Sequence, residues 1–318
     1  MKTKIVYVVV SDETDIFLEQ ALLSVYSLRQ HNPNAIVEFV LDQHTDKTIT
    51  GKRTEILKYI NKKTVVSVPD EYDEKAPRSR WLKTSLSQHV KGDFLYVDTD
   101  TVITDNLEEI DNFTGDLGAV ADRHTTLQYH FGRDRLKKEA LEGGWKYSDD
   151  MVWFNGGLLF VRDNDLAKAF FNEWNTQWKE SYKKTKRLTD QIPLCITNEK
   201  FKYPIKELEG EWNCQISMNG ISYLSNAKII HYLAYDANDN AWKFYDKDIL
   251  QEIKEYGYIT ERISTLVHNA KKTFYIPNRI IVGKDIDVIN SPLFGLCKRS
   301  PLFFSVFNTI ARLVSKII

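Results

Sequence analysis

Two aspartates, one residue apart, follow an apolar run in the first half of the chain. The stretch FLYVDTDTVI, residues 94–103, leads from four strand-forming residues directly into Asp98 and Asp100. In an extended backbone, residues i and i+2 face the same way, so both carboxylates would lie on one face. Two like charges near a partly buried strand end are unfavourable unless something neutralises them. Mg²⁺ and Mn²⁺ take one or two carboxylates and fill their other positions with phosphate and water, so the motif predicts a metal that carries a diphosphate.

The same motif has two other interpretations. A lone Asp-x-Asp is common by chance, as a solvated loop that caps the next helix. An apolar strand followed by Asp-x-Asp also opens phosphatases of the haloacid-dehalogenase type, in which the first Asp is a nucleophile and the second a general acid. That class begins on the motif, whereas here residues 1–93 precede it and carry three predicted strand–helix units. The position of the motif therefore favours the metal site.

Strands and helices alternate in the part of the chain that leads to the motif. We predict strands at 5–10, 35–42, 64–69 and 93–98, and helices at 15–32 (capped by Asp15), about 48–61 and 78–90. The alternation predicts a parallel sheet with helices on both faces. Ligands of such sheets bind beyond the carboxyl ends of the strands, and Asp98 and Asp100 follow one of these ends. After residue 110 the pattern loosens into strands at 116–122, 155–162 and 227–233 and helices at 163–184, 241–257 and 302–318.

The composition is that of an ordinary globular protein, with 42% hydrophobic and 27% charged residues. A formal net charge of −1 gives no global basic field for nucleic acid. The cysteines, Cys195, Cys214 and Cys297, form no zinc or redox pattern, which favours a reducing compartment. The apolar run at 5–10 is too short for a signal peptide, and no stretch approaches the length of a membrane span. We therefore expect a cytoplasmic protein.

Five stretches, in order across residues 3–243, resemble the retaining glycosyltransferases of family 8. They are VVVSDETDIFLEQALLSVYSLRQHNPNAIVEFVLD, RSRWLKTSLSQHVKGDFLYVDTDTVITDNL, FNGGLLFVR, LTDQIPL and IIHYL. The resemblance implies an α/β fold of the GT-A type, a Rossmann-like mixed sheet flanked by helices. We expect this domain over residues 1–260 and a C-terminal helical extension over 261–318.

The resemblance also implies a metal site and a donor site. Asp98, Asp100 and His231 would bind Mn²⁺, or Mg²⁺, which bridges the two phosphates of a UDP-sugar and stabilises UDP as it leaves. Ser11 and Asp12 would lie near the uracil and ribose. The other donor-binding residues would be Arg80, Lys83, Thr99, Asp122, Asn155 and Gly156, with Asp190 and Gln191 beneath the anomeric carbon as the catalytic pair. Alternatively, Arg80 and Lys83 form a solvated helix face, Asp190 caps a helix, and NGG is a turn.

One stretch departs from the family pattern. The family follows its histidine with Gly-x-x-Lys-Pro-Trp, whose lysine helps to hold the diphosphate, but this chain reads HYLAYDANDNAWKFY. If Trp242 is the terminal Trp, Asn240 replaces the lysine and Ala241 the proline. Lys243 or a residue elsewhere would then take over that role. The alternative is a catalytically impaired protein that keeps the fold and binds UDP or a saccharide.

The implied reaction transfers a hexose, glucose or galactose, to a saccharide acceptor with retention of the anomeric configuration. Gln191 is a poor nucleophile, so front-face attack through an oxocarbenium-like state is plausible, with Gln191 and Asp190 stabilising positive charge.

The C-terminal segment suggests where the acceptor lies. Residues 288–318 contain no acidic residue, and 302–318 predicts a helix with an apolar stripe and a basic, polar side, too short to span a bilayer. It suits the interface of an anionic membrane and a lipid-linked acceptor, as in lipopolysaccharide or capsule assembly on the inner face of the membrane. The alternative is a helix that docks on the catalytic domain or on a partner copy.

Overall fold

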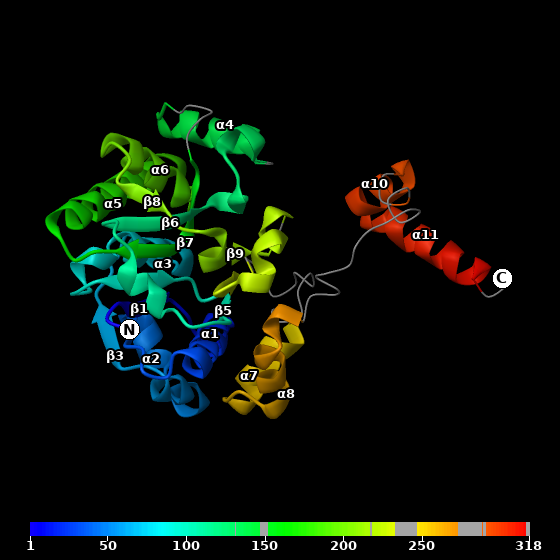
Figure 1. Cartoon of the computed structure of the whole chain (residues 1–318), viewed down its shortest axis with the longest axis horizontal. Coiled ribbons are helices and arrows are strands. Elements are labelled where there is room, and N and C mark those ends of the chain that lie inside the picture. The colour runs from blue at the N-terminus through cyan, green and yellow to red at the C-terminus, as the bar shows by residue number, and fades with distance from the viewer. Residues whose placement is uncertain are drawn as a thin grey trace. The chain divides into compact units, whose positions relative to one another are not determined.

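The computed structural model describes residues 1–130, 132–146, 152–216, 218–232, 247–272, 288 and 291–315. The chain forms two compact units, Met1–Tyr275 and Ile276–Ile318, whose elements are labelled in Figure 1. The first unit includes two helices, α7 (Lys247–Tyr256) and α8 (Glu261–His268), that follow the site-bearing strands. Ile263 and Val267 of α8 are buried in its core, although the domain boundary expected at residue 260 stays a prediction.

A seven-stranded mixed sheet forms the centre of the first unit. Its strand order is β3-β2-β1-β4-β7-β6-β8. The strands are β1 (Lys4–Val9), β2 (Val37–Asp42), β3 (Lys62–Val66), β4 (Phe94–Val97), β6 (Leu117–Ala121), β7 (Phe154–Val161) and β8 (Ile205–Glu207). The first four are parallel, as predicted, and β7 runs antiparallel between β4 and β6. This confirms the predicted α/β class with a mixed sheet, and places the carboxyl end of β4 beside the start of β7.

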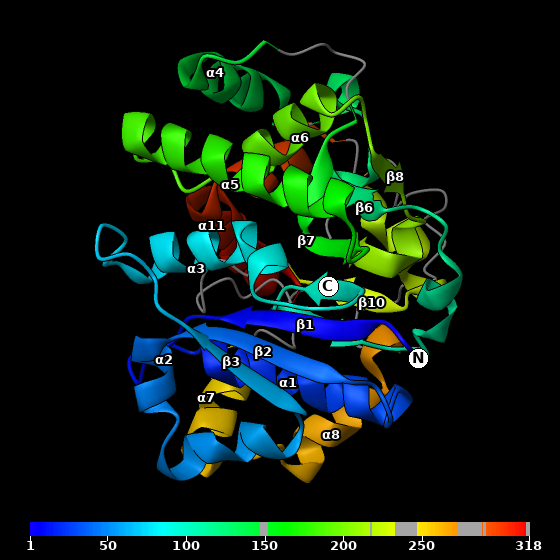
Figure 2. The ribbon, with the colours of Figure 1, turned by 90° about the vertical axis from the view of Figure 1, so that its left-hand side faces the viewer.

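Helices cover both faces of the sheet, as Figure 2 shows. The core on one face includes residues of α1 (Phe17–His31), α7 and α8, with α7 packed against α1, and the core on the other includes residues of α3 (Lys75–Thr84), α5 (Asp165–Thr185) and α6 (Gln191–Lys200). Alternate residues of β1 enter the two cores: Ile5, Tyr7 and Val9 on the α1 side, and Val6 and Val8 on the α3 side. Burial on both faces explains why this strand is an unbroken apolar run.

A second, three-stranded sheet begins directly after the Asp98–Asp100 motif. It has the order β5-β10-β9, built from β5 (Thr101–Ile103), β10 (Ile229–His231) and β9 (Cys214–Gln215). β5 and β10 are antiparallel, with Thr101 opposite His231. This register brings His231 next to the residues that precede β5.

Several expected elements differ in detail. α1 begins at Phe17, with Ile16 as the residue before it, one residue later than the predicted cap at Asp15 implies. The Asp15 carboxylate nevertheless accepts a hydrogen bond from the Phe17 amide at 3.1 Å, and it also accepts from the Ser11 hydroxyl and the Asp12 amide. The helix expected at about 48–61 is a short α-helix, α2 (Gln43–Thr48), followed by a 3₁₀ helix, η1 (Gly51–Lys58). Of the helix expected at 241–257, residues 241–246 lie outside the described residues.

The remaining elements of the first unit lie along its loops. They are η2 (Leu86–Gln88), η3 (Glu108–Asn112), η4 (Asp122–His124), η5 (Leu127–Tyr129), α4 (Arg133–Gly143), η6 (Gly210–Asn213), η7 (Met218–Asn226) and η9 (Ala270–Lys272). η4 and η6 matter for the site, because η4 directly follows β6 and η6 leads directly into β9.

The second unit contains two consecutive helices, α10 (Pro292–Arg299) and α11 (Pro301–Val314). Ser291 and Ser300 cap them through their hydroxyls, and a proline follows each cap at the first helical position. α11 confirms a helix in the predicted segment 302–318, of which residues 316–318 lie outside the described residues. Within the described parts of the chain, no helix combines the length and apolarity needed to cross a bilayer.

Candidate metal and sugar site

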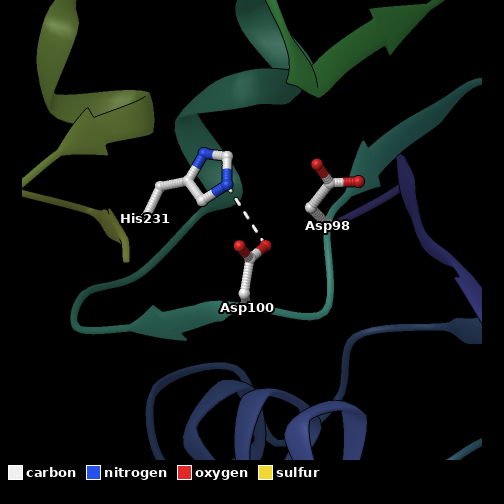
Figure 3. A group of neighbouring side chains, drawn as sticks. All are labelled: Asp98, Asp100 and His231. Atoms are coloured by element: carbon white, nitrogen blue, oxygen red, sulfur yellow. Dashed lines mark ion pairs between the residues drawn. The ribbon is translucent and has the colours of Figure 1, made fainter. Parts of the chain in front are cut away.

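The structure brings together Asp98, Asp100 and His231, the three predicted metal ligands. Asp98 follows β4, Asp100 immediately precedes β5, and His231 ends β10. One potential ligand atom of each lies within 4.8 Å of the other two. Figure 3 shows the three side chains turned toward a common space. The motif is not a continuous extended strand, because residues 98–100 form a bend between β4 and β5; the bend lets the two carboxylates converge.

His231 is buried and presents one particular nitrogen to the aspartates. Its Nε2 lies 3.2 Å from Asp100 Oδ1, and its Nδ1 lies 2.9 Å from Asn213 Oδ1. Burial would lower the pKa of His231, but the Asp100 carboxylate outweighs it and raises that pKa. Burial would raise the pKa of Asp100, but His231 holds it lower. Each group thus stabilises the charged form of the other.

Gly157 of β7 leaves the room that these ligands occupy. A Cβ at this position would lie 2.3 Å from His231 Cε1 and 2.8 Å from Asp98 Oδ2, closer than real Cβ contacts come. The Gly157 carbonyl also accepts a hydrogen bond from the Asp98 amide at 2.8 Å. Two carboxylates and one imidazole form a donor set that suits Mn²⁺ and Mg²⁺. The residues present therefore fit a divalent cation.

Lys83 of α3 links the metal ligands to the predicted catalytic pair. Its Nζ lies 2.8 Å from Asp190 Oδ2 and 3.6 Å from Asp98 Oδ1, while Arg80 Nε lies 3.7 Å from Asp190 Oδ1. Burial would raise the pKa of Asp190, but Lys83 and Arg80 hold it below the ordinary value. Lys83 is only 3% exposed, so the alternative of a solvated helix face is wrong for this residue. Its ammonium group neutralises Asp190.

Asp190 and Gln191 start helix α6 beside β7. Asp190 is the residue before the helix, and its side chain makes no cap hydrogen bond, so its interpretation as a helix cap is wrong. The Asp190 carbonyl accepts a hydrogen bond from Trp174 Nε1 at 2.9 Å. Gln191 Nε2 lies 3.4 Å from the Phe154 carbonyl. The Cβ position of Gly156 lies 3.2 Å from Lys83 Nζ, which places this glycine at the Asp190 side of the site.

Asp122 and Asn155 form a second buried pair. Asn155 Nδ2 donates to Asp122 Oδ1 at 2.8 Å, and His130 Nε2 lies 2.9 Å from Asp122 Oδ2. The Gly132 amide donates to His130 Nδ1, so the ring proton on Nε2 points to Asp122. Burial would raise the pKa of Asp122, but the hydrogen bonds from His130 and Asn155 keep it low. Asp122 is therefore an ionised acceptor, which suits sugar hydroxyls.

The turn after Asp122 is strained and held by Gln215. Arg123 and His124 both have positive φ, 56° and 53°, a region that non-glycine residues rarely adopt. The Gln215 side chain accepts from the Arg123 amide at 2.7 Å and donates to the Ala121 carbonyl at 2.9 Å. Its backbone amide donates to His124 Nε2 at 3.2 Å, and burial lowers the pKa of His124 to about 4. His124 is therefore a neutral acceptor at neutral pH.

Ser11 and Asp12 belong to a cross-linked loop after β1, the strand next to β4. The Ser11 hydroxyl donates to Asp15 and accepts from Arg53 Nη2 at 2.8 Å. Lys75 Nζ lies 2.9 Å from both Asp12 Oδ2 and Asp15 Oδ2. Hydrogen bonds from Thr14 and Lys75 hold the pKa of Asp12 well below its usual range. The loop is thus fixed at the same edge of the sheet as the metal ligands. Thr99 lies at this edge too, because it stands between Asp98 and Asp100 in the chain.

Sequence reasoning missed several residues of this site. They are Tyr96, His130, Gly157, Asn213 and Gln215. The Tyr96 hydroxyl donates a hydrogen bond to the Asp98 carboxylate. The double glycine of FNGG was a signal for Gly157. Asn213 and Gln215 lie in the string EWNCQ, which carries no motif that can be interpreted without its tertiary partners.

Comparisons with known proteins agree with the fold described above. The model of Glycosyl transferase family 8 matches residues 8–244. The chain is similar to the apo structure of the bifunctional glycosyltransferase WbbM, with 16% identity, 83% of this chain and 51% of that chain covered, and a TM-score of 0.54. It is similar to the galactosyltransferase LgtC in complex with donor and acceptor sugar analogues, with 14% identity, 83% and 99% coverage, and a TM-score of 0.52. Among curated proteins, no sequence matches significantly.

Gly157→Ala should weaken metal binding. The added Cβ would meet the His231 ring and the Asp98 carboxylate, so at least one ligand has to move. We expect the Mn²⁺ dissociation constant to rise at least about tenfold, since even groups behind the ligands contribute 10–100-fold. The measurement is a titration of Mn²⁺ followed by the electron paramagnetic resonance of the free ion. Gly156→Ala is the matched control, because the heavy atoms nearest to its Cβ are Lys83 Nζ at 3.2 Å and Asp190 Oδ2 at 3.5 Å, neither of which belongs to a predicted metal ligand; equal affinity in both variants would contradict the prediction.

Lys83→Met should destabilise the fold through Asp190. Removing one partner of a buried ion pair leaves the other charge uncompensated and costs about 3 kcal/mol, with Arg80 3.7 Å away as the remaining cation. Adding Asp190→Asn should recover part of the loss, and urea unfolding of both single variants and the double variant measures it. Strict additivity of the two substitutions would show that the pair does not interact. Because folding lowers the pKa of Asp190, its stabilisation is present at neutral pH and lost below about pH 4.

Proposed function

The chain belongs to glycosyl transferase family 8 and has a GT-A fold, and from that premise we propose that it transfers a hexose, glucose or galactose, from a UDP-sugar to a saccharide hydroxyl with retention. The observation that supports this most directly is the meeting of Asp98, Asp100 and His231 around the space left by Gly157. These three residues would hold Mn²⁺, or Mg²⁺. Membership of this family favours transfer over the phosphatase chemistry considered for the motif alone.

The proposed reaction divides the work among four sets of residues. Asp98, Asp100 and His231 would hold a divalent cation, which would supply charge stabilisation for the diphosphate leaving group. Ser11 and Asp12 bind the nucleoside, on a loop that Arg53 and Lys75 hold in place. Asp122 accepts hydrogen bonds from the hexose hydroxyls, and the Asn155 amide exchanges hydrogen bonds with them. Lys83, buried between Asp98 and Asp190, adds positive charge on the donor side, and Lys243 lies outside the described residues.

Retention follows a front-face route in this proposal. The bond between the anomeric carbon and the phosphate oxygen breaks, the acceptor oxygen bonds to the same face of that carbon, and the acceptor proton passes to the departing phosphate oxygen. Asp190 is a poor candidate for a nucleophile, because both of its oxygens face cations, Lys83 at 2.8 Å and Arg80 at 3.7 Å. Its negative charge and the Gln191 amide instead stabilise the oxocarbenium-like state.

Asp100→Asn should abolish metal-dependent turnover and leave the fold intact. The substitution removes one anionic ligand and the charge that faces His231, so we expect a loss of more than about 100-fold, beyond the 10–100-fold that outer groups contribute. The assay follows UDP release from a panel of UDP-sugars with Mn²⁺ and saccharide acceptors. Asp165→Asn is the matched control, because Asp165 is exposed and follows the far end of β7.

Three outcomes of this assay separate the candidate functions. Transfer or donor hydrolysis by the wild type and its loss in Asp100→Asn support the proposal, and full activity in Asp100→Asn would defeat the metal assignment. Binding of UDP with Mn²⁺ but no turnover of any UDP-sugar would favour the non-catalytic binding protein. That alternative rests on the sequence after His231, which departs from the family pattern.

We also propose that α11 binds an anionic membrane surface, so that the acceptor is lipid-linked and the protein is peripheral on the inner face of the membrane. Its apolar residues are all at least partly exposed, Leu302 at 74% and Leu313 at 60%. Residues 288–318 carry the basic residues Lys298, Arg299, Arg312 and Lys316 and no acidic residue. Each cation contributes about 1 kcal/mol near an anionic surface, so apolar contact and charge act together.

Replacing Phe303, Phe307 and Ile310 by serine should release the protein from vesicles. These side chains are 46%, 36% and 50% exposed on α11, and they belong to the apolar stripe suited to lie in the interface. Co-sedimentation with phosphatidylglycerol vesicles measures the binding, with phosphatidylcholine vesicles as the weaker-binding comparison. Ser305→Ala with Thr309→Ala is the control on the same helix. Unchanged sedimentation of the triple variant, or a wild type that forms a dimer and ignores vesicles, would contradict the proposal.

A further inference from the structure

Asn213 lies where the metal ligands meet the predicted sugar-binding residues. It ends η6 immediately before β9 and is fully buried. Its Oδ1 lies 2.9 Å from His231 Nδ1, and its Nδ2 donates to Asn155 Oδ1 at 3.0 Å. Asn155 in turn donates to Asp122 at 2.8 Å. A continuous run of buried hydrogen bonds therefore joins Asp122 to His231 through two amides.

The contacts of Asn155 fix which way the Asn213 amide points. The Gly157 amide donates to Asn155 Oδ1 at 2.9 Å, and Asn155 Nδ2 donates to Asp122 Oδ1. These contacts show which end of the Asn155 amide is oxygen and which is nitrogen. Because the Asn155 oxygen faces Asn213 and can only accept, Asn213 must turn a donor toward it. Asn213 therefore turns its nitrogen to Asn155 and its oxygen to His231.

This orientation in turn selects one form of the His231 ring. An amide oxygen only accepts, so Nδ1 of His231 carries the hydrogen that it receives. Nε2, which faces Asp100 at 3.2 Å, then has its lone pair available for a cation. Groups that hold the second nitrogen of a metal-binding histidine commonly determine its tautomer and orientation.

We propose that Asn213 is a positioning residue that fixes His231 for metal binding and couples the metal site to the donor-sugar site through Asn155. The inference rests on the proposed function, because it assigns His231 to a divalent cation and Asp122 and Asn155 to the sugar. Asn213 contacts neither reacting atoms nor the cation, and acts only through its two partners.

Two near-isosteric substitutions separate the two ends of this link. Asn213→Asp keeps an acceptor for His231 Nδ1 but loses the donor to Asn155 Oδ1. Asn213→Leu removes both contacts and leaves no room for a bridging water. The matched control is Asn198→Ala, a buried asparagine of α6 that accepts from the Ile205 amide at 3.1 Å, remote from His231 in its contacts.

The experiment measures Mn²⁺ affinity of the full chain by paramagnetic resonance, without any sugar. We expect Asn213→Leu to bind Mn²⁺ 10–100-fold more weakly than the wild type, and Asn213→Asp and Asn198→Ala to stay within about threefold of it or tighter. With Mn²⁺ saturating, both Asn213 variants should lose affinity for the UDP-sugar relative to UDP alone, since both lose the contact with Asn155. Thermal unfolding checks that each variant is folded, and Asn213→Ala replaces the leucine variant if that one is not.

The outcomes distinguish this inference from the function on which it rests. If the wild type binds Mn²⁺ and Asn213→Leu binds it equally well, the positioning role is wrong and the metal assignment stands. If Asn213→Asp loses Mn²⁺ as strongly as the leucine variant, the His231 acceptor is not what matters, and the inference also fails. A wild type that does not bind Mn²⁺ would instead overturn the proposed metal site itself.

Discussion

The antiparallel pairing of β5 with β10 is the constraint on which the site depends. It sets Thr101 opposite His231, and the Tyr232 amide donates to the Asp100 carbonyl at 3.0 Å. Because Asp100 immediately precedes β5, a shift of this ladder by one residue would turn the His231 side chain to the other face. The pairing therefore places the histidine in the site, and the bend after β4 places the two aspartates. Both are needed to bring the three side chains together.

Charge is distributed unevenly over the groups that this pairing brings together. Asp190 has Lys83 at 2.8 Å and Arg80 at 3.7 Å, whereas Asp98 has Lys83 only at 3.6 Å and Asp100 faces a titratable imidazole. The protein thus neutralises the Asp190 end with its own permanent cations. At the Asp98–Asp100 end the negative charge calls for a further cation, and this asymmetry argues that a metal binds there and not between Asp98 and Asp190.

The sequence predicted the parts of the site whose signals are local. An apolar strand that runs into Asp98, and a short strand that carries His231, can be recognised one stretch at a time. Asn213 and Gln215 could not be recognised in this way, because each acts through a partner distant in sequence, Asn155 and the turn after Asp122. The double glycine of FNGG marks Gly157, but it does not show that this residue lies against the His231 ring. The insertion of β7 antiparallel between β4 and β6 has no local signal either, yet it decides which glycine lies against the metal ligands.

Two buried amides of one short segment control the two halves of the site. Asn213 and Gln215 are two residues apart; the first contacts His231 and Asn155, and the second holds the strained turn at Arg123 and His124. Backbone strain of this kind persists only where surrounding contacts determine it, and here they are hydrogen bonds from a strand that pairs with β10. The segment is therefore bound to the histidine strand on one side and to the Asp122 turn on the other. A displacement of β9 would disturb metal and sugar groups together, so the geometry of transfer is set by this strand as much as by the ligands themselves.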